Sequence, residues 1–223
     1  MNYEKTFKKL SERVRDFLSK SPRCHDWDHT IRVLNNARML AKAEKKVDTR
    51  VVEIAALFHD IARADELSIQ GKICHAKKGA EMTRQILLDE GLNEEFIEKV
   101  AKCVKRHRFR SGAIPQTIEE KIVYDADKLD SLGAVGIARA FLFAGRIGAK
   151  VHNTPEEALN SKSYSENDTA YREYLFKLKD LPKKMLTETG REIGRRKVLF
   201  MDKFFKKLDE EIYPKEPVSK VRE

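Results

Sequence analysis

The stretch AALFHDIA, residues 55–62, places His59 and Asp60 inside an otherwise apolar run. Apolar residues in and before this stretch recur at intervals of three and four, which predicts a helix with Asp48 as its N-cap. Burying an imidazole beside a carboxylate costs several kcal/mol unless the groups are paired, hydrogen-bonded or bound to a metal ion. The stretch therefore indicates a helical core with a site built into it.

Two more predicted helices carry ionisable side chains on apolar faces. Upstream, His29 lies one turn before an apolar stripe within residues 33–41. Downstream, the sequence TIEE at residues 117–120 has the form of a capping box, and Asp127 and Asp130 share the inward face of the helix that it opens. The candidate metal ligands are His29, His59, Asp60 and Asp127.

Two neutral nitrogens and two anionic oxygens suit a hard or borderline divalent cation, namely manganese, nickel, cobalt, iron, zinc or magnesium. The set needs no thiolate, which argues against a purely structural zinc site. A Cys/His zinc site or a thiolate nucleophile is the alternative, because Cys24, Cys74 and Cys103 each lie near a histidine in the sequence. Neither alternative explains the His-Asp pair at residues 59–60 or Asp127.

A histidine, a His-Asp doublet and a distant aspartate, all on helices, resemble the signature of the HD-domain metal-dependent phosphohydrolases. The resemblance covers residues 20–145. The segments HDWDHTIRV (25–33), ALFHDI (56–61) and DADKLDSLGA (125–134) are similar to those of small stand-alone HD hydrolases with nucleotide pyrophosphohydrolase activity. The resemblance implies an HD-domain helical bundle in which the four candidate ligands hold a divalent cation.

Two histidines between the doublet and Asp127, His75 and His107, lie on the apolar faces of two further predicted helices. In HD enzymes with two metals, histidines in this interval hold the second ion. The resemblance therefore makes His75 and His107 candidates for a second metal, and contact with a substrate phosphate is the alternative. Packing at a helix end is the third reading.

Hydrolysis of a phosphate ester or anhydride also needs cationic groups that position the substrate. Lys128, next to Asp127, and Arg32, one turn after His29, are the expected substrate-binding cations, and Lys128 is also a catalytic candidate. Asp60 is a further catalytic candidate because it belongs to the doublet. Asp130 could accept a proton, orient a ligand or bind a sugar hydroxyl, and the sequence leaves these three roles open.

The chain reads as helix after helix with no strand-period run, which predicts an all-α fold. We expect an HD phosphohydrolase domain over residues 1–150 and a flexible loop over 151–169, either a lid or a simple connection. Residues 170–223 are expected to form a C-terminal helical extension that packs on the same domain or forms a homodimer face.

The chain carries 45 Lys and Arg against 36 Asp and Glu, a net charge of +9. The two signs are interspersed and no basic cluster is interleaved with exposed aromatic residues, so nucleic acid is not the expected partner, whereas a nucleotide is. No apolar run approaches the ~20 residues that span a bilayer, and the N-terminal residues lack the apolar core of a signal peptide. The three cysteines form neither an even disulfide set nor a Cys-x-x-Cys pair, which indicates a reducing compartment. We therefore expect a cytoplasmic protein without a membrane partner.

These observations lead to one main hypothesis, a divalent-metal-dependent phosphohydrolase that acts on a nucleotide such as a (deoxy)nucleoside triphosphate through metal-activated water. Within the same class, the alternative is hydrolysis of a cyclic nucleotide or a nucleoside monophosphate. Outside it, the alternative is a noncatalytic protein that binds a nucleotide or nucleic acid. The substrate itself depends on pocket walls that the sequence does not arrange in space.

Overall fold

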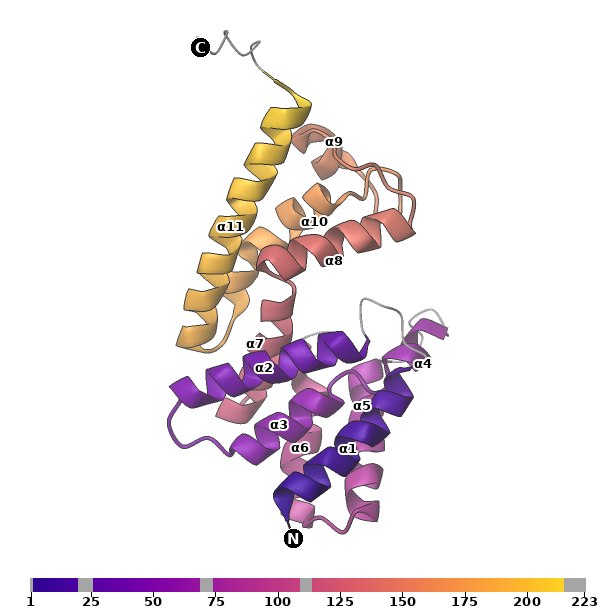
Figure 1. The fold of residues 1–223 in the computed structure, drawn as a ribbon, viewed down its shortest axis with the longest axis vertical. Coiled ribbons are helices and arrows are strands. Elements are labelled where there is room, and N and C mark those ends of the chain that lie inside the picture. The colour runs from indigo at the N-terminus through magenta and orange to yellow at the C-terminus, as the bar shows by residue number, and fades with distance from the viewer. Residues whose placement is uncertain (1, 20–25, 69–73, 109–113, 215–223) are drawn as a thin grey trace, which may run out of the picture. The chain divides into compact units, whose positions relative to one another are not determined.

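The computed structural model describes residues 2–19, 26–68, 74–108 and 114–214, and helices dominate all four ranges (Figure 1). No strand occurs among these residues, which confirms the all-α prediction. The α-helices are α1 (Tyr3–Leu18), α2 (Trp27–Ala43), α3 (Thr49–Phe58), α4 (Arg63–Ser68), α5 (His75–Asp89), α6 (Glu94–Arg106), α7 (Ile118–Asp130), α8 (Gly133–Arg146), α9 (Pro155–Asn160), α10 (Ala170–Phe176) and α11 (Glu188–Ile212). None of the helices in the described ranges is both long enough and apolar enough to cross a membrane.

The chain divides into two compact units. The first comprises Met1–Ser131 together with Lys183–Ile193, and the second comprises Leu132–Pro182 together with Gly194–Glu223. The domain boundary expected at residue 150 therefore needs correction, because the division follows α7 directly. Part of the expected C-terminal extension also belongs to the first unit.

Asp125 on α7 explains why residues 183–193 belong to the first unit. Its carboxylate accepts hydrogen bonds from the backbone N–H of Leu186 (2.9 Å), the backbone N–H of Thr187 (2.7 Å) and the Thr187 hydroxyl (2.7 Å). Burial raises the pKa of Asp125, and these three donors offset part of that rise. Gly133, the first residue of α8, has φ +72°, a backbone conformation that favours glycine.

In the first unit α2 packs on α3 and α7, while α6 packs on α3, α5 and α7. Asp48 caps α3 as predicted, since its carboxylate accepts from the N–H groups of Arg50 and Val51. The predicted capping box at α7 forms only in part. The Thr117 hydroxyl accepts from the N–H of Glu120, but the Glu120 carboxylate bonds Arg106 and the N–H of Gln116 instead of the cap residue.

The second unit corrects the expected loop at residues 151–169. This segment contains α9, whose N-cap Thr154 forms a complete capping box with Glu157. The His152 side chain is only 2 % exposed and packs on Tyr171 with ring centroids 4.8 Å apart. A role for this segment as a lid stays a prediction.

The expected helical extension begins with two short elements. Helix α10 ends at Phe176, and a 3-10 helix, Leu178–Lys184, follows. Pro182 lies inside that 3-10 helix, where its ring is tolerated in a short turn. Helix α11 follows the 3-10 helix.

Candidate metal centre

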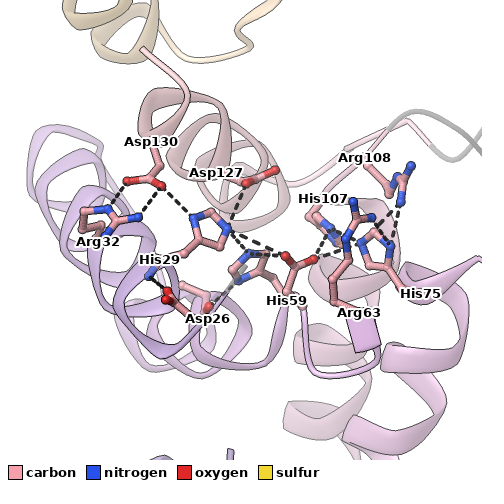
Figure 2. Close-up of polar contacts among 12 residues, drawn as sticks. Asp26, His29, Arg32, His59, Arg63, His75, His107, Arg108, Asp127 and Asp130 are labelled. Atoms are coloured by element: carbon pink, nitrogen blue, oxygen red, sulfur yellow. Dashed lines mark hydrogen bonds and ion pairs between the residues drawn. The ribbon is translucent and has the colours of Figure 1, made fainter. Parts of the chain in front are cut away.

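Four imidazole rings and two carboxylates meet at helix ends in the first unit (Figure 2). The cap of α2, Asp26, accepts from the N–H of His29, so this ring lies in the first turn of the helix. His59 follows the last residue of α3, and Asp60 comes next in the turn that follows. His75 opens α5, His107 follows α6, and Asp127 lies in the last turn of α7. All four rings and Asp60 are buried.

Three of these residues form what we call the first trio, His29, His59 and Asp127. The two Nε2 atoms lie 3.2 Å apart, and His29 Nε2 lies 3.6 Å from Asp127 Oδ1. The potential ligand atoms all lie within 4.8 Å of one another, a spacing at which one cation can contact all three. The structure thus brings together three of the four residues that the sequence selected as ligands.

The fourth, Asp60, belongs to the second trio with His75 and His107. Asp60 Oδ1 lies 3.0 Å from His75 Nε2, and the Nε2 atoms of the two rings are 3.2 Å apart. The other oxygen of the same carboxylate, Oδ2, lies 3.7 Å from the Nε2 atoms of both His29 and His59. Asp60 therefore faces both trios, one oxygen toward each.

Three of the rings are held by hydrogen bonds at Nδ1, which we call the outer nitrogen because Nε2 faces the trio. His59 Nδ1 lies 2.8 Å from the carbonyl oxygen of Ala56, and His107 Nδ1 lies 2.7 Å from that of Val104. Because a carbonyl can only accept, each Nδ1 donates, and the neutral ring keeps its lone pair on Nε2. His29 Nδ1 lies 2.7 Å from Asp130 Oδ2 in the same kind of arrangement. The rings are thus oriented with Nε2 toward the trios.

The pKa shifts of His107 and Asp127 favour the protonation states that metal ligands require. Burial lowers the pKa of His107 well below its usual value, and the neighbouring His59 and His75 add to this effect. Burial acts against the ionised form of Asp127, but Lys128 and the nearby histidines hold its pKa well below the usual range. A neutral imidazole and an ionised carboxylate are the forms that bind a cation.

Among the described residues, neither trio includes a cysteine thiol. Cys103 is buried, and burial raises the pKa of its thiol well above the usual value, which disfavours the reactive thiolate. Cys74 precedes α5 as its N-cap residue. Cys24 and the neighbouring His25 lie outside the described residues. The donor set is nitrogen and oxygen, which fits the divalent cations expected from the sequence.

The two expected substrate cations both lie at the site and both have protein partners. Arg32 donates to Asp130 Oδ1 (2.7 Å) and Oδ2 (3.2 Å), so it holds the carboxylate that orients His29. Lys128 Nζ lies 2.8 Å from Asp127 Oδ2 and 2.9 Å from the carbonyl oxygen of His107, 4.4 Å from the centre of the Tyr124 ring. Lys128 thereby bonds one member of each trio. The sequence predicted neither the bonds of Arg32 nor those of Lys128, since they join residues on different helices or at a helix end.

Residues 26–132 match the family model of the HD domain. The chain is 34 % identical over 203 residues to the Bacillus subtilis protein YpgQ, and the match covers 89 % of this chain and 90 % of that protein. This chain belongs to the HD-domain family. It is a metal-dependent phosphohydrolase, and the divalent cation expected from the sequence is the cofactor of this family.

Solved structures agree with this assignment. The crystal structure of YpgQ matches with a TM-score of 0.75 at 28 % identity, covering 96 % of this chain and 99 % of that one. A second crystal structure of YpgQ, in complex with ADP, matches with a TM-score of 0.71, covering 96 % and 98 %. The crystal structure of a predicted HD-superfamily hydrolase from an uncultured Thermotogales bacterium matches with a TM-score of 0.66 at 28 % identity, covering 92 % of both chains.

Proposed function

We propose that this HD-domain protein hydrolyses a phosphoanhydride or phosphoester bond of a nucleotide, such as a (deoxy)nucleoside triphosphate. The observation that carries the proposal is the position of Asp60, whose two oxygens face two separate trios of ligand atoms. A pair of adjacent cations is the arrangement by which many enzymes act on phosphate groups. The ADP bound to YpgQ supports a nucleotide as the substrate.

The proposed ligands divide along the trios. His29, His59 and Asp127, with Oδ2 of Asp60, would hold one divalent cation, and His75, His107 and Oδ1 of Asp60 would hold a second. When bound, such ions lower the pKa of water and neutralise charge on a phosphoryl oxygen. Of the three roles that the sequence leaves open for Asp130, its bond to His29 Nδ1 favours orientation of this ligand.

Lys128 has a different proposed role from the one that the sequence suggested. Its bonds to Asp127 and to the carbonyl of His107 favour a positioning residue that holds the ends of α6 and α7 together. Arg32 acts in the same way through Asp130. Their charges still contribute a positive potential that attracts an anionic substrate.

The test is a screen of turnover with several nucleotides and several divalent cations. We expect hydrolysis of a nucleotide that depends on the added cation and disappears in Asp127→Ala, with helicity retained in the far-ultraviolet circular dichroism spectrum. The products identify the bond, because pyrophosphate, phosphate and triphosphate each report a different cleavage. Retained turnover in Asp127→Ala would contradict the proposed ligand set. Turnover restricted to cyclic nucleotides or monophosphates would instead support the alternative substrate class.

A further inference from the structure

Asp125 lies on α7 two residues before the proposed ligand Asp127, and its side chain is buried. Residues two positions apart in an α-helix point about 160° away from each other around the axis. Asp127 is directed at His29 of the first trio, whereas Asp125 is directed at the backbone around Thr187. The two carboxylates therefore serve opposite sides of one helix.

The partner of Asp125 is the chain at the start of α11. As described above, the carboxylate accepts from the N–H groups of Leu186 and Thr187 and from the Thr187 hydroxyl, and Thr187 directly precedes α11. The same hydroxyl accepts from the N–H of Gly190 at 3.0 Å, so it both donates and accepts. A negative charge at a helix N-terminus is also favoured by the helix dipole. We call the three bonds to Asp125 the Asp125 anchor.

Gly190 shows how closely α11 approaches this carboxylate. A Cβ atom at this position would lie 2.5 Å from Asp125 Oδ2 and 2.6 Å from Thr187 Oγ1, which is too close for any side chain. Glycine inside a helix costs about 1 kcal/mol relative to alanine. Its presence in the first turn of α11 fits the anchor, because a side chain at this position would displace Asp125 from Thr187.

Helix α7 is fixed from two further directions close to Asp127. On the side of α2, Asn36 Nδ2 donates to the carbonyl oxygen of Ala126 at 3.1 Å. On the side of α6, Lys128 Nζ donates to a backbone carbonyl at the end of that helix at 2.9 Å. Together with Asp125, these attachments lie within one turn of Asp127, so they oppose rotation of α7 about its axis.

An apolar contact would hold α7 against residues 183–193 without the cost of burying a carboxylate. Hydrogen bonds differ from apolar contacts because they fix direction as well as distance. Direction matters here because a metal site tolerates errors of only about 0.2 Å in the positions of its ligand atoms.

We propose that Asp125 is a positioning residue of the metal centre, which fixes the rotation of α7 and thereby the place of Asp127 in the first trio. The inference rests on the proposed function for the cation that Asp127 binds. The second trio takes no ligand from α7, so the anchor acts on the first trio alone.

Thr187→Val tests the anchor because it replaces the hydroxyl with a methyl group and keeps the branched shape of the side chain. Manganese binding is measured by electron paramagnetic resonance. We expect affinity to fall by about tenfold in one step of the isotherm and to keep the parent value in the other. Thr187→Ser, which keeps the hydroxyl, should bind like the parent in both steps. Asp125→Asn, whose amide brings N–H groups against the donors, should show the same pattern as Thr187→Val with a larger loss.

Thr83→Val is the matched control. Thr83 is also buried in the first unit, and its hydroxyl donates to the carbonyl oxygen of Gly79 on its own helix at 2.7 Å, so both manganese steps should stay unchanged. If Asp125 only stabilises the fold, Thr187→Val will unfold at a lower denaturant concentration and bind manganese like the parent. That result overturns the proposal, and so do equal losses in both steps. A protein that shows the expected pattern but hydrolyses no nucleotide keeps the anchor and loses only the proposed substrate.

Discussion

The two trios offer nearly the same ligand atoms in different surroundings. In the first trio, the outer nitrogen of His29 meets the carboxylate of Asp130, and that of His59 meets a backbone carbonyl. In the second trio, His107 also meets a carbonyl, but His75 meets the guanidinium groups of Arg63 and Arg108. Partners that accept a proton make imidazole a better ligand, whereas nearby cations oppose a metal ion. Ligand identity alone therefore does not decide how tightly each trio holds a cation.

Asp60→Asn removes the carboxylate that both trios share and should have the largest effect. Turnover is expected to fall by at least about a thousandfold, because cation binding stabilises the transition state by several kcal/mol. Steady-state rates with saturating manganese measure the change. Asp65→Asn is the control, since Asp65 lies nearby in α4 and pairs with Lys78 at 2.9 Å in a half-exposed ion pair. Near-parental turnover in Asp60→Asn would show that the shared carboxylate is not required.

Asp130→Asn separates the trios, because the Asp130 carboxylate contacts His29 of the first trio. Loss of a partner that orients a metal-bound histidine lowers metal affinity roughly 10- to 100-fold. We expect this loss in one step of the manganese binding isotherm and no change in the other. Asp28→Asn, an exposed position on the same helix as His29, serves as the control. Equal losses in both steps would mean that the trios do not act separately.

Lys128→Met tests the connection between the trios and keeps the aliphatic stem beside Tyr124. Without the bonds to Asp127 and to the carbonyl of His107, manganese affinity should fall by about tenfold while KM at saturating metal stays near the parent value. The reverse pattern, a raised KM with unchanged metal affinity, would assign Lys128 to substrate binding.

The smallest effect concerns the stability of the metal-free protein. The pKa of His107 lies well below its unfolded value of 6.5 because the ring is buried. Below pH 6.5 the unfolded chain binds a proton that the folded chain does not, so the free energy of unfolding falls as the pH decreases. The contribution is about 1.4 kcal/mol per pH unit. Denaturant unfolding between about pH 6.5 and 5.5 should therefore depend less on pH in His107→Gln than in the parent, and equal slopes would contradict the shift.

The sequence predicts much of the first unit because its signals are local. Helical spacing around His29, His59 and Asp127 and the N-cap at Asp48 depend on residues only a few positions apart, and the structure has helices with these faces and this cap. His75 and His107 could be selected for the same reason, since each lies at one end of an amphipathic helix.

The remaining features depend on contacts between distant segments. Nothing local indicates that Asp60 directs one oxygen to each trio, because that position is set by the packing of α3, α5 and α6. The boundary of the first unit depends on bonds from Asp125 to Leu186 and Thr187, about sixty positions along the chain. The convergence of Arg63 and Arg108 on His75 has the same origin. Helical periodicity shows which face is buried and not which residues meet there.

The most direct test is a crystal structure of the protein with manganese, in which anomalous scattering locates the ions. The account predicts two manganese peaks, one contacting His29, His59 and Asp127 and one contacting His75 and His107. The two oxygens of Asp60 should bind one ion each. A single ion bound by residues of both trios, or ions that avoid Asp60, would contradict the account.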